Sequence, residues 1–388
     1  MELNLQQGEV VVHVEHDGES LGCPECSQPA RRYDTRQRRW RHLDTCQYRT
    51  IVAAEVPRVQ CEHRQVKQIA VPWSEGRSRF TALFEALVID WLQEAAISAV
   101  AQQMGLSWDE VDGIMQRAVQ RGLERREVQA PQRIGVDETS FQKRHEYVTV
   151  VNDLDGHVLH VADGRGKKAL EEFYKQFDGE QLARIQTVAM DMWEPYISVS
   201  TQYVAEAQKK IAFDKFHVAG HLGDAVDRVR RAEHRGLAAE DDQRLKGSRY
   251  RWLTNPENMD EERWEQFAAL RSSALQTARA WGYKEHAMTL WEYRTRDGAR
   301  NAWQAWYRSA IRCRLEPVKK VARMIKRHLE GIVTAVVTKV TNARAESINA
   351  GIQKVKYSAR GFRNRKRFRN AIYFHLGGLD LYPAGVTR

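Results

Sequence analysis

Short runs of apolar and β-branched residues alternate with longer amphipathic stretches over the middle of the chain. Such runs, bounded by turn residues, are typical of strands, and Asp153-Leu-Asp-Gly156 predicts a hairpin turn between two of them. The patterns predict strands at 133–138, 146–152, 157–162, 185–190 and 210–213. They also predict a helix at about 167–177 and another that begins at Glu194.

Two of the predicted strands end in an acid. Three strands followed by helix, strand, helix and strand is the order of an RNase H-like α/β fold, in which the first and fourth strands are neighbours. Asp137, on the first strand, and Asp191, at the end of the fourth, are therefore expected to meet. Asp214 and His217 follow the fifth strand, where they either assist the site or fix the junction between strand and helix.

A third acid, Glu346, lies near the start of a helical pattern late in the chain. Three acids brought together form an oxygen-rich site that suits Mg²⁺ or Mn²⁺ rather than a soft metal. Two such ions can clamp the attacking and leaving oxygens of a phosphoryl transfer. The hypothesis is that Asp137, Asp191 and Glu346 are catalytic and hold two ions.

Residues 77–127 have a helical pattern. Apolar residues recur one turn apart over Ile97–Met104, Gly105 breaks the pattern, and Ser107 is a typical N-cap for a second helix. Helix, glycine turn and capped helix is the helix-turn-helix pattern, although an α-hairpin that only packs would share it. The second helix would offer Trp108, Asp109, Asp112, Gln116 and Arg117, of which Trp108, Gln116 and Arg117 are the predicted DNA contacts. The acids at its start suit the helix dipole but not a phosphate.

The stretch 226–335 is much longer than one strand and one helix require. Its pattern is helical, and it contains six of the eleven tryptophans. Aromatic residues at helical spacing are more typical of a core than of a ligand platform. The sequence therefore predicts an all-α insertion with its own core between Asp191 and Glu346.

Four of the five cysteines fall within the first 61 residues. A C-x2-C knuckle followed, after a strand-like run, by a second ligand pair is how a structural zinc ribbon is built. The predicted zinc ligands are Cys23, Cys26, Cys61 and His63. His42 and Cys46 are spare candidates. The alternative is that these thiols are reduced and bind no metal. A domain this small would then lack the metal that stabilises its fold.

Two basic segments are candidates for contact with DNA phosphates. The first contains Arg38, Arg39, Trp40 and Arg41. The second, beside Glu346, contains Lys354, Lys356, Arg360, Arg363, Arg365, Lys366 and Arg367. Basic residues interleaved with aromatic residues fit a phosphate-contacting face, and a solvated charged surface is the competing interpretation.

The length and the net charge of the chain are consistent with a protein of several domains that binds nucleic acid. The chain has 388 residues and a formal net charge of +10, which indicates a polyanionic partner, nucleic acid before membrane. No apolar run reaches the roughly 18 residues of a membrane span, and the N-terminus lacks the regions of a signal peptide. An odd number of cysteines does not resemble a secreted disulfide framework, so a cytosolic protein is expected.

These patterns divide the chain into five segments. We expect a zinc-ribbon-like domain at 1–75, a helix-turn-helix domain at 76–130, a first catalytic part at 131–225, the helical insertion at 226–335, and the last catalytic helix with a basic tail at 336–388.

With these residues identified, the chain resembles the ISL3 family of bacterial insertion-sequence transposases over essentially its whole length. The most specific segments are Ile134-Gly-Val-Asp-Glu138, Met190-Asp-Met-Trp-Glu-Pro-Tyr196, Phe213-Asp-Lys-Phe-His-Val218, Asn342-Ala-Arg-Ala-Glu-Ser-Ile-Asn349, Gly361-Phe-Arg-Asn364 and Phe374-His-Leu-Gly-Gly378. The resemblance implies a zinc-binding domain, a helix-turn-helix and an RNase H-like DDE domain, with Asp137, Asp191 and Glu346 at the DDE positions. In the family, two residues usually separate the second pair of zinc ligands. Here a single residue, Glu62, separates Cys61 from His63.

The function that this resemblance implies is Mg²⁺-dependent DNA transposition. The N-terminal domains would recognise the terminal inverted repeats, and the acids would cut a strand and join its 3′-OH to target DNA. The expected partners are double-stranded DNA and a second copy of the chain, and no membrane. The expected location is the bacterial cytoplasm, at the nucleoid. Two alternatives are a nuclease that cuts without joining and a DNA-binding regulator with an inactive catalytic domain. The presence of all three acids argues against the regulator.

Overall fold

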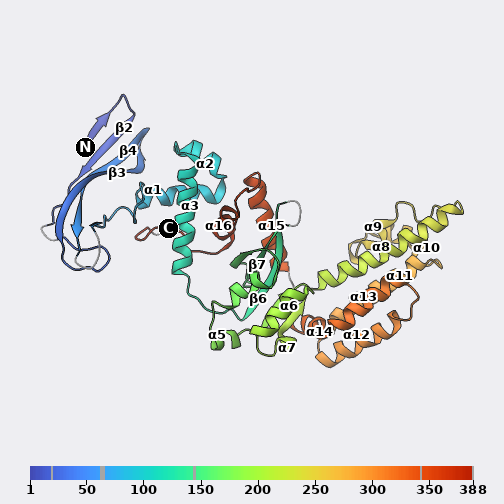
Figure 1. Ribbon diagram of the computed structural model, residues 1–388. Coiled ribbons are helices and arrows are strands. Elements are labelled where there is room, and N and C mark those ends of the chain that lie inside the picture. Colours follow the sequence, from blue (N-terminus) through green and yellow to red (C-terminus); the bar gives the residue numbers. More distant parts are fainter. Residues whose placement is uncertain (19–20, 62–65, 143–145, 341–342, 387–388) are drawn as a thin grey trace. The chain divides into compact units, whose positions relative to one another are not determined.

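The computed structural model describes residues 1–18, 21–61, 66–142, 146–340 and 343–386. The chain forms two compact units, shown with their elements in Figure 1. The first unit contains Met1–Glu127 and Lys354–Arg388, and the second contains Val128–Gln353. The boundary near the C-terminus falls inside helix α15 (Ala343–Ser358).

A sheet of five strands begins the first unit. Its strands are β1 (Glu2–Asn4), β2 (Glu9–Val14), β3 (Arg31–Thr45), β4 (Tyr48–Gln60) and β5 (Lys67–Gln68). The long strands β3 and β4 pair antiparallel, and β2 lies parallel to β4. Trp40 on β3, opposite Val52 on β4, packs with Val56 and Val59 in a small core. At 1% exposure the Trp40 ring is part of this core, so it does not belong to a phosphate-contacting face.

Three helices follow the sheet: α1 (Ala82–Glu94), α2 (Ile97–Met104) and α3 (Trp108–Arg125). Gly105 ends α2 with a φ of +63°, a left-handed conformation that costs glycine little. Ser107 and Glu110 form a capping box that starts α3. The local signals in the sequence thus set the boundaries of the helix-turn-helix.

The last helix, α16 (Arg365–Leu376), packs on α3. Ala371 and Phe374 of α16 share a buried cluster with Val111 and Ile114 of α3. The residues from Lys354 onward therefore lie in the unit of the helix-turn-helix, whereas the sequence pattern predicted that all of 336–388 belongs to the catalytic domain. The difference arises because the apolar side of α16 finds its partner on a helix that precedes it by about 250 residues.

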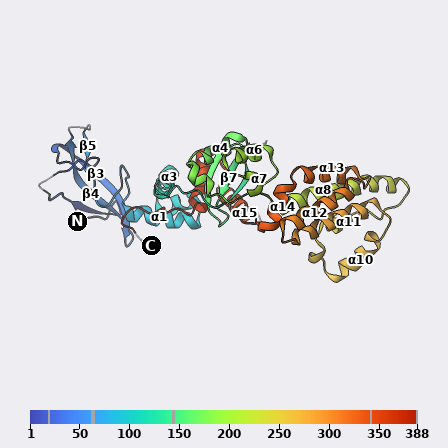
Figure 2. The same ribbon diagram turned by 90° about the horizontal axis from the view of Figure 1, so that it is seen from below.

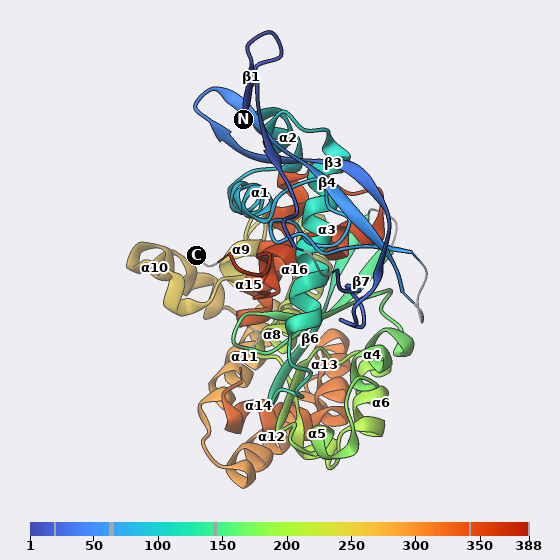
Figure 3. The ribbon, with the colours of Figure 1, turned by 90° about the vertical axis from the view of Figure 1, so that its left-hand side faces the viewer.

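The second unit contains the predicted central sheet, which Figure 3 shows with its flanking helices. Its strands are β6 (Arg133–Gln142), β7 (Glu146–Asn152), β8 (Val158–Asp163), β9 (Thr187–Met190) and β10 (Ile211–Phe213). Their order in the sheet is β10-β9-β6-β7-β8, with β6, β7 and β8 antiparallel and β6, β9 and β10 parallel. This is the RNase H-like arrangement that the order of elements predicted.

Helices connect and follow these strands. Those around the sheet are α4 (Lys167–Tyr174), α5 (Gly179–Ala183), α6 (Glu194–Tyr203) and α7 (Ala207–Lys210). The helical insertion contains α8 (Lys215–Ala239), α9 (Arg249–Leu253), η1 (Pro256–Asn258), α10 (Glu261–Arg271), α11 (Gln276–Thr289), η2 (Leu290–Glu292), α12 (Arg296–Ala310), α13 (Glu316–Arg327) and α14 (Leu329–Thr338). Figure 2 shows α8, α11, α12 and α13 side by side.

The tryptophans of the insertion line its interior, as their helical spacing predicted. Trp252, Trp303 and Trp306 are fully buried. The insertion does not have a core of its own, however, because these rings belong to one buried cluster with Ile134 of the sheet. The clusters merge where α14 packs on β10: a Cβ at Gly331 would collide with the Phe213 ring, so glycine permits this close approach.

Among the helices that the structure describes, none combines the length and the apolar character required to cross a membrane.

Candidate active site

Asp137 and Asp191 lie at the same edge of the second sheet. Strands β6 and β9 run parallel with Gly135 opposite Ala189, so the two acids, each two residues further along, come next to each other. In each acid Oδ1 accepts a hydrogen bond from the N–H of the following residue, at 2.8 Å for Asp137 and 2.6 Å for Asp191. The predicted meeting of these two acids is thus explained by strand order and register.

The carboxylate of Asp137 is held in an environment that disfavours its charge. Burial raises its pKa and the nearby Asp191 charge adds to this, while the N–H of Glu138, the His217 ring and Asn349 act in the opposite direction. Among the described residues, no Lys or Arg forms an ion pair with Asp137 or Asp191. Two adjacent carboxylates without a Lys or Arg partner in the described part of the chain are suited to a hard divalent cation.

Glu346 lies on α15, the helix that reaches this edge of the sheet. Asn349, one turn after Glu346, donates from Nδ2 to Asp137 Oδ2 at 2.8 Å, and Gln353 donates to Thr139 Oγ1 at 3.1 Å. Residues three apart share one side of a helix, so Glu346 is on the side of α15 that carries Asn349. Its own side chain is exposed. In the described part of the chain the three acids are not gathered within 4.8 Å of one another.

The start of α8 brings His217 to the site. Its Nδ1 lies 3.7 Å from Asp191 Oδ1. Asp214 is buried and is the N-cap of α8, with its side chain accepting from the N–H of Phe216 at 3.1 Å. Of the two alternatives for this pair, the structure therefore gives Asp214 a role in the strand–helix junction and leaves His217 beside the acids. Further along, burial lowers the pKa of His328, against the raising effect of Asp191 and Glu194.

Sequence reasoning missed three residues of this site. Glu138, next to Asp137, is half-buried, and burial raises its pKa while Arg165, 3.5 Å away, lowers it. The Arg165 guanidinium lies over the rings of Tyr147 and Trp193, at 4.5 and 5.0 Å. Asn349 could have been found from its spacing of three after Glu346. Nothing in the local sequence around Arg165 points to Glu138.

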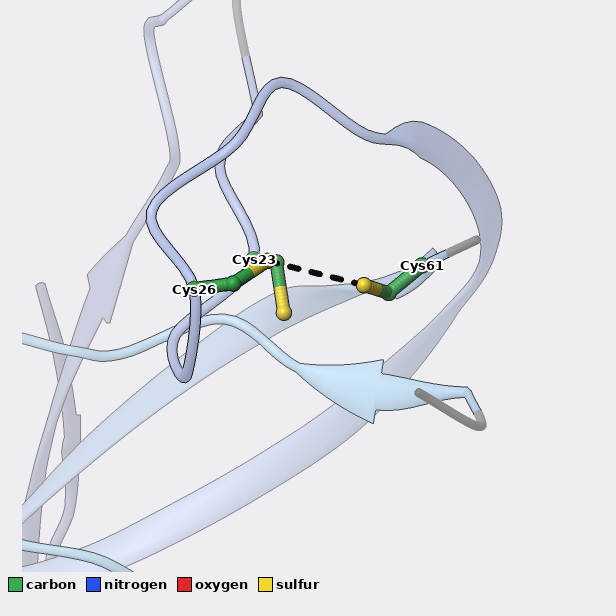
Figure 4. A group of neighbouring side chains, drawn as sticks. All are labelled: Cys23, Cys26 and Cys61. Atoms are coloured by element: carbon green, nitrogen blue, oxygen red, sulfur yellow. Dashed lines mark hydrogen bonds between the residues drawn. The ribbon is translucent and has the colours of Figure 1, made fainter. Parts of the chain in front are cut away.

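Three cysteines of the N-terminal sheet form a compact group, shown in Figure 4. The sulfur atoms of Cys23, Cys26 and Cys61 lie within 4.8 Å of one another, with 3.6 Å between those of Cys26 and Cys61. Hydrogen bonds from the backbone of Glu25 and then of Cys26 lower the pKa of the Cys23 thiol to about 7. Clustered cysteine thiols are typical ligands of structural zinc sites, so this group is a candidate zinc site.

The other predicted zinc ligands are placed differently. His63 lies outside the described residues. His42 directs Nδ1 to Thr81 Oγ1 at 2.9 Å, and Cys46 is exposed in the turn between β3 and β4. Neither His42 nor Cys46 belongs to the three-cysteine group.

Comparison with known families agrees with this geometry domain by domain. A family model described as a transposase, of the ISL3 family, matches residues 134–372, which include the sheet, the insertion and most of α16. The chain belongs to the ISL3 family of transposases. The family's helix-turn-helix model matches residues 69–119, and the zinc-finger model of the transposases of IS204, IS1001, IS1096 and IS1165 matches residues 20–63.

Two relatives of this ISL3 transposase align over most of their length. A transposase for insertion sequence element IS1557 of Mycobacterium tuberculosis is 30% identical over 372 residues, which cover 88% of this chain and 82% of the relative. A transposase for insertion sequence element IS1001 of Bordetella parapertussis is 26% identical over 354 residues, or 89% of this chain and 86% of the relative. The similarity thus extends across both units.

In this ISL3 transposase the first basic segment makes mostly internal contacts. Arg38 donates to Gln68 Oε1 at 2.7 Å, and Arg39 to Glu9 Oε2 at 3.2 Å. Arg41 pairs with Asp44 and lies 4.9 Å from the centre of the Phe84 ring. Arg39 is the exposed member of the three, so it is the one that a phosphate could reach without a rearrangement.

The predicted DNA-contacting residues of α3 are also engaged within the unit. Gln116 donates to Asp112 at 2.7 Å. Arg117 donates through Nε and Nη2 to the buried carboxylate of Glu85 on α1, at 2.9 and 2.5 Å. Trp108 is 39% exposed beneath the guanidinium of Arg367, 4.4 Å away. The structure therefore gives Arg117 a place in the packing of α1 on α3.

Replacement of Glu85 by Ala is expected to destabilise the first unit by about 3–5 kcal/mol, because it leaves Arg117 and Arg121 without their buried partner. Thermal unfolding of the full chain, followed for the transition of this unit, measures the effect. Glu94→Ala on the exposed side of the same helix is the control and should change stability by less than about 0.5 kcal/mol. Equal effects of the two substitutions would contradict this role of Glu85.

The second basic segment divides into engaged and exposed residues. Arg367 pairs with Asp109 and Asp112 at 3.0 Å each, so it neutralises the acidic start of α3. Burial lowers the pKa of Lys356, and Arg365 is half-buried. The exposed members are Lys354, Arg360, Arg363 and Lys366. These four are the side chains of the segment most accessible to a phosphate.

Proposed function

We propose that Asp137, Asp191 and Glu346 form the DDE active site with which this transposase cuts DNA at the ends of an insertion sequence and joins the 3′-OH to target DNA. The observation that carries the proposal is the adjacency of Asp137 and Asp191 on parallel strands. Glu346 is the third acid because its helix, α15, is bonded to Asp137 through Asn349. The two relatives are transposases for IS1557 and IS1001, in agreement with this chemistry.

The donor set fits two Mg²⁺ or Mn²⁺ ions, since it consists of carboxylate oxygens that lack a Lys or Arg partner among the described residues, with the His217 ring 3.7 Å from Asp191. Bound divalent ions would supply Lewis acidity at the scissile phosphate. The chain's own residues position the ligands: Asn349 holds Asp137, and His217 orients Asp191. No covalent intermediate with the enzyme is required, because positioning and charge neutralisation carry the reaction.

The N-terminal elements would supply specificity for the ends. The helix-turn-helix and the zinc ribbon would read the terminal inverted repeats. One structural zinc would be held by Cys23, Cys26 and Cys61, with His63, which lies outside the described residues, as the fourth candidate from the sequence. Pairing of two ends requires at least a homodimer on DNA, which would assemble at the bacterial nucleoid.

Replacement of Asn349 by Ala is expected to lower the rate of end cleavage by about 10- to 100-fold and to raise the divalent-ion concentration at half-maximal rate, because Asp137 loses the group that orients it. The measurement is a titration of cleavage rate with Mg²⁺. Gln353→Ala is a matched control, since Gln353 makes a similar bond from the next turn of α15 to Thr139. A rate loss without a shift in the Mg²⁺ dependence would refute the positioning role.

The experiment that tests the whole proposal uses purified protein and labelled DNA that carries an end of the element. A nick at the end followed by a joined product, present with Mg²⁺ and absent with EDTA or with Glu346→Gln, is the expected result. A nick without joining would favour the nuclease. Binding of the cognate end without any nick, with Mg²⁺ and also with Mn²⁺, would favour the regulator.

A further inference from the structure

A stripe of histidines and arginines, with one acid among them, leads away from the candidate active site along α8. Residues 217, 221, 224, 228, 231 and 235 are spaced by three or four, which places them on one side of the helix. The stripe starts with His217 beside Asp191. Beyond Asp224 it continues with three arginines, Arg228, Arg231 and Arg235, all of them exposed. The opposite side of α8 is apolar and buried, with Val218, Leu222 and Val229 in the core.

Helix α13 packs against α8, and residues of both helices, among them His221, Arg228, Pro317 and Met324, line one hollow. The C-terminal end of α13 lies where α8 begins, at the active-site end, because His328 there contacts the Phe213 ring with 5.2 Å between ring centres. Figure 2 shows the two helices along one edge of the insertion.

A groove lies between these helices, and we refer to it as the α8–α13 groove. Its lining residues are His221, Asp224, Ala225, Arg228, Pro317, Lys320, Val321 and Met324. A second hollow continues it toward the end of α8, lined by Arg228, Arg230, Arg231, His234 and Arg235. Asp224 is the one acid in these two sets.

The cations of the groove are available to an outside anion. Within the described residues, no carboxylate pairs with Arg228, Arg235 or Lys320, whereas Arg231 has Asp227 at 3.1 Å. A solvated helix surface ordinarily mixes charges of both signs. Here Asp227 pairs with one of the three arginines beyond Asp224, and the excess of cations on this side of α8 favours a polyanionic ligand.

The length of the stripe matches a segment of DNA. From residue 217 to residue 235 the helix rises about 27 Å at roughly 1.5 Å per residue. That distance corresponds to about eight base pairs at roughly 3.4 Å each. A duplex whose scissile phosphate reaches Asp137 and Asp191 would thus have its backbone within reach of all three arginines.

We propose that the α8–α13 groove binds the phosphate backbone of duplex DNA on one side of the scissile phosphate, over about eight base pairs. The inference rests on the proposed function, because the cleavage site sets where the duplex begins. The contacts are to phosphates and carry no sequence preference. The bound segment is either the interior of the element end or the DNA that flanks it, which share this chemistry.

The test compares the full-length protein with a triple variant, Arg228→Gln, Arg235→Gln and Lys320→Gln. Affinity is measured by fluorescence anisotropy without divalent ions, over a range of salt, for three duplexes. One carries the recognised end and stops at the cleavage site, and the others extend it by ten base pairs, either into the flank or further into the element. Lys246→Gln, Arg251→Gln and Arg263→Gln, exposed elsewhere on the insertion, form the control with equal loss of charge.

The triple variant should lose at least about tenfold in affinity, relative to the control, for each duplex that contains the bound segment, with a salt dependence shallower by up to about 2.7, or roughly 0.9 per lost phosphate contact. A loss confined to the duplex extended into the flank identifies the flank as the bound segment. An equal loss for all three duplexes identifies the interior of the end, because all three contain it. No difference in affinity between the triple variant and the control, or a loss confined to the duplex extended further into the element, would overturn the proposal.

Binding without metal keeps this test separate from the proposed function. If the wild-type protein failed to cut DNA but the triple variant bound DNA less tightly than the control, the proposal for the groove would be supported and the cleavage proposal would be wrong. If the wild-type protein cut and joined DNA, and the triple variant bound and cut every duplex as well as the wild type, the proposal for the groove would be wrong and the cleavage proposal would be supported.

Discussion

Asp137→Asn protein is expected to lose cleavage of end DNA by at least about 10³-fold while it binds that DNA with unchanged affinity. The substitution removes a charge from the carboxylate pair that would hold the divalent ions, and several kcal/mol of transition-state stabilisation depend on such ions; about 4 kcal/mol corresponds to this factor. Single-turnover cleavage with Mg²⁺ and a binding titration without it measure the two effects.

The same substitution is expected to raise the stability of the second unit. Burial raises the pKa of Asp137 in the folded protein, so the folded state prefers the neutral carboxyl. Ionisation of Asp137 therefore costs free energy in the folded state. This cost is absent below the pKa that Asp137 has in the unfolded chain, grows as the pH rises through its pKa in the folded protein, and is complete at neutral pH. Asparagine removes it, which predicts a gain in stability at pH 7 that disappears in acid.

A control for both readouts is Asp178→Asn. Asp178 caps the short helix α5 through its side chain, and asparagine is an equally good N-cap, so cleavage and stability should both remain near those of the wild type. Cleavage by the Asp137→Asn protein at more than a tenth of the wild-type rate would remove Asp137 from the catalytic set.

Removal of zinc is expected to unfold the N-terminal sheet and to abolish specific binding of the element end. The three cysteines join the knuckle between β2 and β3 to the end of β4. The hydrophobic core of the sheet, which contains Trp40, is small. Structural zinc contributes about 10 kcal/mol or more to the folding of small zinc domains. Cys26→Ser should therefore lower the zinc content from one ion per chain to near zero and reduce affinity for the end by at least about tenfold.

The measurements are zinc content by atomic absorption, the thermal transitions of the full chain, and end binding. Cys46→Ser serves as the matched control, because Cys46 is an exposed thiol of the same sheet outside the three-cysteine group. Retention of one zinc per chain by Cys26→Ser protein, or its loss from Cys46→Ser protein, would contradict the assigned ligands. The second unit has its own core and should keep its transition in both proteins.

Local signals in the sequence determined most of the elements and part of the site. Gly105 and Ser107 end one helix and start the next through a left-handed turn and a capping box, both of which act within a few residues. Apolar runs predicted the strands of the second sheet, and their order predicted the RNase H-like fold. Because strand order determines neighbours, the meeting of Asp137 and Asp191 followed from the same pattern.

Only the tertiary structure decided which partner each polar or aromatic side chain would find. Arg117 pairs with Glu85, 32 residues away, and Arg367 with Asp109, 258 residues away. Trp40 in the basic segment enters the core, and Asn349 reaches Asp137 across 212 residues. A periodic pattern shows that one side of an element will be buried, but the partner of a charge or a ring depends on packing between elements distant in the chain.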